Sequence, residues 1–198
     1  LNMLDPYWGS VWAGIEALAN YVAVGGNFRQ AALVDNFIWP FPDEESLWGL
    51  DRAVDACCML MDTFGIPFVS GKDSLSSTYK NDDGTVLKIP PVLNISVFGR
   101  IPDAEKTVTA DFKREGSVIA MLGLPDYKCM GGSVFARSQG YVGGKVPKAA
   151  LEKLPGLFDL VHRNVVSGRI LSCHDISEGG LAACLAEMCF GGNCGANI

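Results

Sequence analysis

Two apolar patterns alternate along this chain, and their alternation constrains the fold more than any other feature. Between residues 10 and 24, Val11, Ile15, Leu18 and Val22 recur at the spacing of one helix face. Apolar runs of strand length occur at residues 30–34, 66–69, 92–99, 117–123 and 170–173. Helix and strand patterns that alternate in this way predict an α/β (α+β) protein in which helices cover a mixed sheet.

Capping residues set the expected limits of the first two helices. Ser10 is the expected N-cap of the first helix, and Gly25-Gly26 its end. Asp43 is the expected cap of a second helix that ends at Gly65. The predicted core face of that second helix consists of Leu47, Leu50, Val54, Cys58 and Met61.

A domain boundary is expected between residues 101 and 114, where Pro102, several charges and Gly116 interrupt the apolar pattern. We therefore expect an N-terminal α/β domain over residues 1–107 and a second α/β domain over residues 108–198. The second domain is predicted to contain a glycine-rich turn with a short helix at 131–140. Two longer helices are predicted at 154–167, broken near Pro155, and at 181–190.

Composition excludes several classes of partner. The chain has 198 residues, 48% hydrophobic side chains and a net charge of −6, so no broad attraction to nucleic acid or anionic lipid is expected. Its apolar stretches are too short to span a bilayer, and the start lacks the features of a signal peptide. The seven cysteines include no C-x-x-C pair and are expected to be reduced thiols. A cytoplasmic protein is predicted, and its ends resemble those of a fragment.

Glu16 and Asn20 are the first candidate site residues. They stand four residues apart on the first predicted helix, so both side chains project over one point of its surface. Their oxygen atoms are of the kind that magnesium prefers. A solvated pair without a ligand is the stronger alternative on spacing alone.

Two further candidate sites follow predicted strands. Asp35 is expected to close an apolar strand, where a carboxylate can reach a ligand, although an Asx turn with Asn36 explains it equally well. The sequence Ser-Gly-Lys-Asp-Ser at 70–74 is predicted to be a polar turn in which Gly71, Lys72 and Ser74 suit phosphate oxygens. It is not a P-loop, and a plain polar strand exit is the alternative.

The densest group of polar residues is the segment His-Asp-Ile-Ser-Glu-Gly-Gly at 174–180, between a predicted strand and a predicted helix. The helix N-terminus can bind an anion, and Asp175 can hold the metal ion that accompanies it. Helix capping by Asp175 or Ser177 is the alternative. Capping does not explain why His174 and two glycines stand beside them.

These motifs together resemble those of the formylglycinamide ribonucleotide amidotransferase family. This family is related to aminoimidazole ribonucleotide synthetase and selenophosphate synthetase. The resemblance runs in order through nearly the whole chain, from Asp-Pro-Tyr-Trp-Gly-Ser at 5–10, through Ile-Pro-Pro at 89–91 and Met-Gly-Gly-Ser at 130–133, to the segment at 174–180. It implies the second of two similar halves, incomplete at its C-terminal end. Each half would have an α/β domain that contributes to a shared barrel and a second α/β domain beside it.

The resemblance also implies roles for single residues. Glu16, Asn20 and Asp175 would bind magnesium, Asp35 and Ser177 would contact ATP or ADP, and a phosphate would lie against the remaining three residues, Gly71, Lys72 and Ser74. Some relatives have Asn at the position of Lys72, which leaves metal binding there open as well. The catalytic histidine would lie in the missing first half, so no catalytic residue is assigned to this chain.

The implied reaction converts formylglycinamide ribonucleotide, ATP and glutamine to formylglycinamidine ribonucleotide in de novo purine biosynthesis. Ammonia would come from a glutaminase domain or subunit. Two alternatives stay open. One is a scaffold half that binds a structural nucleotide and performs no chemistry. The other is a different ATP-dependent enzyme of the superfamily, which the absence of the selenophosphate synthetase glycine loop disfavours.

Overall fold

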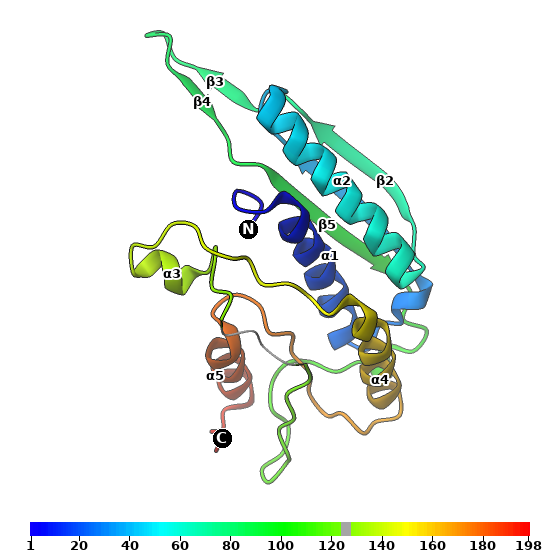
Figure 1. Cartoon of the computed structure of the whole chain (residues 1–198). Helices are drawn as coiled ribbons and strands as arrows, with labels where there is room; N and C mark the ends of the chain where they lie inside the picture. The colour runs from blue at the N-terminus through cyan, green and yellow to red at the C-terminus, as the bar shows by residue number, and fades with distance from the viewer. Residues whose placement is uncertain (124–127) are drawn as a thin grey trace.

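The computed structural model describes residues 1–123 and 128–198 (Figure 1). Five α-helices, five β-strands and three short 3-10 helices are present in these residues. In chain order they are α1 (Pro6–Ala23), η1 (Phe28–Gln30), β1 (Ala31–Ile38), α2 (Glu44–Phe64), β2 (Phe68–Ser74), β3 (Thr78–Lys80), β4 (Val86–Lys88), β5 (Val92–Gly99), η2 (Ala104–Lys106), α3 (Val134–Ser138), η3 (Leu151–Lys153), α4 (Leu154–Val166) and α5 (Gly180–Gly192).

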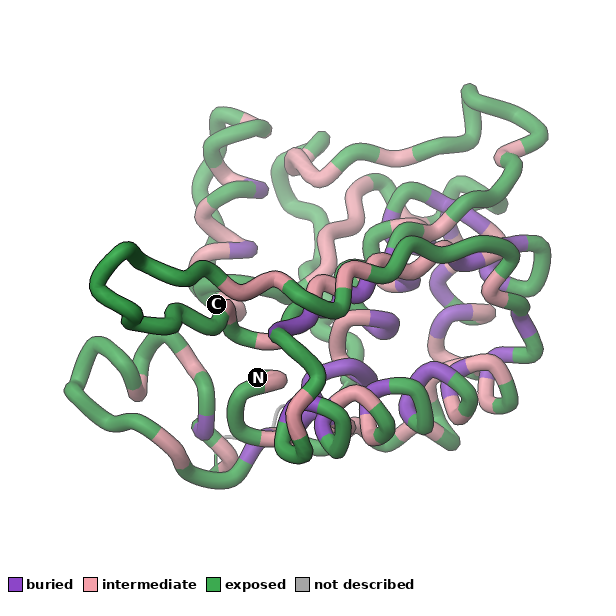
Figure 2. The backbone as a smooth tube through the Cα atoms, turned by 90° about the horizontal axis from the view of Figure 1, so that it is seen from above, coloured by how far each residue is buried: buried purple, intermediate pink, exposed green. Residues whose placement is uncertain are grey.

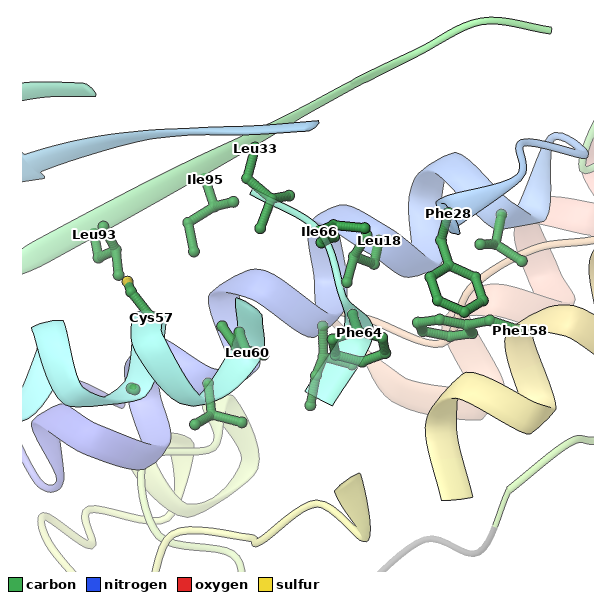
Figure 3. Packing of buried hydrophobic residues seen from close by; sticks show 14 of the residues in the cluster. Leu18, Phe28, Leu33, Cys57, Leu60, Phe64, Ile66, Leu93, Ile95 and Phe158 are labelled. Atoms are coloured by element: carbon green, nitrogen blue, oxygen red, sulfur yellow. The ribbon is translucent and has the colours of Figure 1, made fainter. Parts of the chain in front are cut away.

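A three-stranded mixed sheet, with the order β2-β1-β5, is the centre of the N-terminal part. β1 pairs with β2 in parallel, which requires a crossover that α2 supplies, and with β5 in antiparallel orientation. Leu33, Leu93 and Ile95 on one face of this sheet are buried and lie over Cys57 and Leu60 of α2 (Figure 3). The predicted arrangement of helices on a mixed sheet is therefore confirmed for this part of the chain.

The first helix begins earlier than the sequence predicted. Asp5 caps it by accepting a hydrogen bond from the Trp8 backbone N–H at 3.0 Å, and Pro6 occupies its first turn. Ser10 lies inside the helix and is fully buried, so its prediction as the N-cap was wrong. Gly25 follows the helix with a φ of 98°, which confirms the predicted end.

The second helix has the predicted caps but a different buried face. Asp43 accepts a hydrogen bond from the Ser46 backbone N–H, and Gly65 ends the helix in the left-handed conformation. The predicted core residues Leu47 and Val54 are exposed, as is Cys58, whereas the buried set is Ser46, Gly49, Ala53, Ala56, Cys57, Leu60 and Phe64. Small residues dominate this set because α1 packs closely against α2. A Cβ on Gly14 of α1 would overlap the Leu60 side chain.

Strands β1 and β2 are both longer than predicted. β1 continues through residues 35–38, and β2 contains the whole segment 70–74 that was predicted as a turn. This prediction was wrong because the backbone groups of residues 70–74 pair with residues 34–38 of β1. The predicted turn at 80–85 is confirmed, since it joins the hairpin strands β3 and β4.

Residues 108–198 contain helices and loops but no strand in the described part of the chain. The predicted strands at 117–123 and 170–173 do not form, because neither segment pairs with another strand within the described residues. The helices near 134–138 and 181–190 are confirmed as α3 and α5. Pro155 occupies the first turn of α4, where it is tolerated, so the predicted break does not occur.

Helix α4 attaches this second part to the first. Phe158 stacks on Phe64 with ring centroids 5.7 Å apart, and its ring also packs edge-on against Phe28 (Figure 3). Arg29 of η1 forms a two-pronged ion pair with Asp159. The buried residues gather where the sheet, its helices and α4 meet, while several long loops are exposed (Figure 2). None of the helices in the described residues has the length and apolarity required to cross a bilayer.

Candidate functional site

The structure places Asp35 and Gly71 next to each other in paired strands. Asp35 lies in the middle of β1 rather than at its end, and its partner in β2 is Gly71. A Cβ on Gly71 would overlap the Asp35 carboxylate. The glycine therefore provides the space that this carboxylate occupies, in addition to any access that it gives to a ligand.

Lys72 and Ser74 project from the opposite face of the sheet, because successive side chains in a strand alternate between faces. Their side chains contact each other, with Lys72 Nζ donating to Ser74 Oγ at 2.5 Å. The four nucleotide residues predicted on β1 and β2 are thus divided into two pairs. Asp35 and Gly71 share the face of the buried residues Leu33 and Phe37, whereas Lys72 and Ser74 lie on the uncovered face.

The electrostatic surroundings of Asp35 favour its protonated form. Partial burial and the neighbouring Asp73 carboxylate raise its pKa, while the Lys72 backbone N–H acts in the opposite direction. Cys57 of α2 lies in the same environment. Burial, followed by the charges of Asp35 and Cys58, raises the pKa of the Cys57 thiol to about 12. This thiol is therefore protonated at neutral pH and is a packing group rather than a nucleophile.

Glu16 and Asn20 are both exposed on α1 and lie one helical turn apart. Their exposure agrees with the predicted pair of oxygen ligands on one surface of the helix. The opposite side of α1 is buried through Val11, Leu18 and Val22. Packing of these residues in the core therefore sets the orientation of α1 about its own axis. In this orientation Glu16 and Asn20 face outward.

The segment at 174–180 forms a polar loop that enters α5. His174 Nδ1 lies 3.2 Å from Asp175 Oδ1, and His174 Nε2 lies 3.0 Å from Glu187 Oε2 of α5. Asp175 is largely buried, with 12% of its side chain exposed, whereas Ser177 is exposed. Gly179 and Gly180 have φ values of 82° and 66°, a conformation that explains the paired glycines.

Glu187 contacts the candidate site through His174 and was not predicted from the sequence. Through His174 it connects α5 to Asp175, which is the arrangement that commonly orients a metal-binding residue. Its signal in the sequence is a single carboxylate in an otherwise apolar helix. That signal does not reveal which residue it contacts, since His174 is thirteen positions away.

The chemistry of the predicted metal ligands fits magnesium, which takes a few protein oxygens and completes its shell with phosphate and water. Glu16, Asn20 and Asp175 supply carboxylate and amide oxygens, and His174 holds one oxygen of Asp175. Among residues 1–123 and 128–198, no three or more His, Cys, Asp or Glu side chains converge as a metal site.

Comparison with known proteins supports the resemblance. Residues 114–198 match the family described as "AIR synthase related protein, C-terminal domain". The chain is 36% identical, over 98% of its length, to "Phosphoribosylformylglycinamidine synthase subunit PurL" of Caldanaerobacter subterraneus subsp. tengcongensis. It is 32% identical, also over 98% of its length, to the subunit of the same name from Thermoplasma acidophilum. The chain spans about a quarter of these relatives, 26% and 24% respectively.

Solved structures share the fold. "T. maritima PurL complexed with FGAR" has a TM-score of 0.63 at 17% identity and covers 96% of this chain and 29% of its own. "T. maritima PurL complexed with ATP" has a TM-score of 0.58 at 20% identity, with 96% and 27% covered. "Structure of PurLQS from Thermotoga maritima" has a TM-score of 0.57 at 16% identity, with 94% and 27% covered. The predicted resemblance and the α/β fold class are confirmed by these matches.

Proposed function

We propose that this chain, which resembles one quarter of a PurL subunit along nearly its whole length, forms part of a phosphoribosylformylglycinamidine synthase. Such an enzyme is a cytoplasmic ATP-dependent carbon–nitrogen ligase of purine biosynthesis. It converts formylglycinamide ribonucleotide to formylglycinamidine ribonucleotide with ammonia from glutamine. The observation that carries the proposal is the 36% identity to a PurL subunit over 196 residues, which cover 98% of the chain.

The reaction would proceed by phosphoryl transfer from ATP to the amide oxygen of the substrate, with release of ADP. Ammonia would then add to the activated carbon, and phosphate would depart with the former amide oxygen. Catalysis of this type depends on positioning and on neutralising phosphate charge. We assign this task to the ammonium group of Lys72, the hydroxyls of Ser74 and Ser177 and a magnesium ion held by Glu16, Asn20 and Asp175.

The nucleotide contacts predicted for Asp35 and Gly71 form a separate proposal, because these two residues lie on the face of the sheet opposite Lys72 and Ser74. Partial burial and the Asp73 carboxylate raise the pKa of Asp35. The ammonia source would be a glutaminase domain or subunit, a view supported by the name PurLQS of one structural relative. The other half of the enzyme would supply the remaining catalytic groups.

The magnesium assignment is tested on the full-length subunit that contains this chain. Calorimetry would measure ADP binding with and without magnesium for wild type, Asp175→Ala and the exposed hairpin control Asp82→Ala. We expect Asp175→Ala to abolish the magnesium-dependent part of the affinity and Asp82→Ala to preserve it. Equal magnesium dependence in all three proteins would remove Asp175 as a ligand.

Glu187 provides a second test of the same site, as a positioning residue. Glu187→Gln is expected to weaken magnesium-dependent ADP binding by about 10-fold or more, because it loosens the His174 side chain that orients Asp175. The binding of ADP without magnesium should not change. A variant that lowers both affinities equally would indicate a general loss of structure instead.

A nucleotide-stabilised scaffold is the second candidate function. It is favoured by the state of the two histidines, since His162 Nδ1 lies 2.9 Å from the Gly25 carbonyl and His174 contacts two carboxylates. Both nitrogens of the His174 ring face carboxylates, so this ring has no nitrogen open to act as a general base on a substrate. Radiolabelled ADP bound before turnover would distinguish the candidates, because a scaffold retains the label through many turnovers and a catalytic site exchanges it.

A further inference from the structure

Helix α2 has two apolar faces, and the core uses one of them. The face that contains Cys57, Leu60 and Phe64 packs against the sheet and α1 (Figure 3). The face that the sequence predicted for the core is largely open to solvent instead. This second face, here called the α2 stripe, consists of Leu47, Leu50, Val54, Cys58 and Met61.

The α2 stripe is a continuous row of accessible apolar side chains. Leu47 and Val54 are 49% and 45% exposed, Cys58 is exposed, and Leu50 and Met61 are half-buried. They recur at intervals of three and four residues over about 21 Å of helix. Single apolar residues on a surface are ordinary, but a row of this length and spacing is typical of a helix that packs against a second helix.

A column of carboxylates runs beside the α2 stripe. Helical geometry places its four members within about 40° of one another, and about 80° around the helix axis from the middle of the stripe. This acidic column consists of Glu44, Asp51, Asp55 and Asp62. Arg52 is the one cation in the sequence of α2, and it pairs with Asp55 at 2.7 Å. The other three carboxylates therefore have no cation on their own helix.

The acidic column restricts what can cover the α2 stripe. A second copy of this face would bring two acidic columns together, and like charges across an interface oppose association. An anionic membrane surface would be repelled for the same reason. A helix with an apolar stripe flanked by basic residues satisfies both features, because its leucine-type side chains match the stripe and its cations match the column.

We propose that the α2 stripe and the acidic column form a docking surface for a basic amphipathic helix of a partner polypeptide. The apolar side chains of that helix would pack on the stripe, and its lysine or arginine side chains would pair with the column. The inference does not rest on the proposed function, since no residue of the stripe or the column belongs to the predicted nucleotide or magnesium sites.

Two synthetic helical peptides of equal length are the probes for this surface. Both have leucines at the spacing of the α2 stripe, and the flanking positions are lysines in one peptide and glutamates in the other. Fluorescence anisotropy with the full-length subunit should show about tenfold tighter binding of the lysine peptide, because several exposed ion pairs of modest strength act together. Equal affinities, or no binding of the lysine peptide, overturn the proposal.

Val54→Asp distinguishes docking from a general attraction of basic peptides to an acidic protein. The variant adds a carboxylate, so general attraction would strengthen binding, whereas docking on the stripe predicts about tenfold weaker binding of the lysine peptide. Val86→Asp in β4 is the matched control and should bind normally, since Val86 is 48% exposed and Val54 is 45% exposed. Both variants should melt near the wild-type temperature. Unchanged or tighter binding by Val54→Asp excludes the stripe.

Reversal of charge in the acidic column tests its part separately. Asp51→Lys combined with Asp62→Lys leaves the Arg52–Asp55 ion pair intact. This double variant should bind the glutamate peptide more tightly than the lysine peptide, the opposite of the wild-type preference. An unchanged preference for the lysine peptide would contradict the role of the column.

Alkylation of Cys58 reports what covers the α2 stripe before any peptide is added. In the full-length subunit, N-ethylmaleimide should modify Cys58, the lysine peptide should protect it, and the buried Cys57 should stay unmodified. An unreactive Cys58 would show that the rest of the subunit covers the stripe. A wild-type dimer that Val54→Asp dissociates, measured by sedimentation, would assign the stripe to a second copy. Either result overturns the partner helix.

Discussion

The two predicted domains, residues 1–107 and 108–198, differ in how completely they bury their own apolar side chains. The first has a sheet whose one face is covered by α1 and α2. In the second, apart from the α4 residues that contribute to the same core, the buried hydrophobic residues are Val146, Cys184 and Met188. Val118 and Val142 there are 93% and 95% exposed. Cooperative stability is therefore expected to reside in the first region.

The difference shows that strand patterns require partners. Residues 92–99 and 117–123 both have apolar patterns of strand length, but only the first finds a neighbour to which its backbone can bond. An extended segment without a neighbouring strand forms no inter-strand hydrogen bonds, so its backbone N–H and C=O groups bond to water instead. The chain spans about a quarter of the length of its PurL relatives.

Hydrogen exchange gives the largest expected contrast. Amides of β1 should exchange at rates set by global unfolding, whereas those of residues 117–123 and 170–173 should exchange nearly freely, a difference of about 1,000-fold or more. Mass spectrometry of peptides from the 198-residue chain would measure it. Equal protection of both sets would contradict the contrast between the regions.

Substitution of a core leucine should have the next largest effect. Leu60→Ala is expected to lower the free energy of unfolding by about 2–5 kcal/mol, because Leu60 of α2 is fully buried in the core between α1 and the sheet. The control is Leu47→Ala on the same helix, which should cost less than about 0.5 kcal/mol since Leu47 is 49% exposed. Denaturant titrations would measure both changes in the free energy of unfolding. A larger loss for Leu47→Ala than for Leu60→Ala would support the helix face that was predicted from the sequence.

Substitution of two glycines by alanine should change stability in opposite directions. Gly71→Ala should destabilise the first region by about 1–3 kcal/mol, because its Cβ would displace the Asp35 carboxylate. Gly156→Ala in α4 should stabilise the second by about 0.5–1 kcal/mol, since a Cβ there meets nothing. Thermal melts would measure both changes. In an Asp35→Ala background the cost of Gly71→Ala should largely disappear, and persistence of the full cost would exclude this contact as its cause.

The smallest effect concerns the pH dependence that Asp35 introduces. Its folded-state pKa is raised, so the folded protein binds a proton more readily than the unfolded chain. Stability should therefore fall as the pH rises from about 4, the ordinary pKa of Asp, through the raised value. Asp35→Asn removes this loss and should gain under about 1 kcal/mol at pH 7 and nothing at pH 3, because solvent screens the charge. A gain independent of pH would point to another cause.

The sequence by itself determined the features that depend on near neighbours. The Asp43 cap, the Gly65 stop, the hairpin turn at 80–85 and the paired glycines before α5 each involve contacts within a few residues. The same holds for the exposed Glu16–Asn20 pair, which follows from helical spacing. The resemblance located most of the candidate site residues for a similar reason, since motif order is a property of the chain.

Only the tertiary structure decided which faces these residues share. Pairing of β1 with β2 and β5 turned a predicted turn into a strand, placed Lys72 and Asp35 on opposite faces of the sheet and aligned Asn36 with Asn94. Close packing of α1 selected small side chains of α2 over the larger ones that hydrophobicity favours. Pairing and packing depend on groups far apart along the chain, and their free energy is gained only once the whole sheet is assembled.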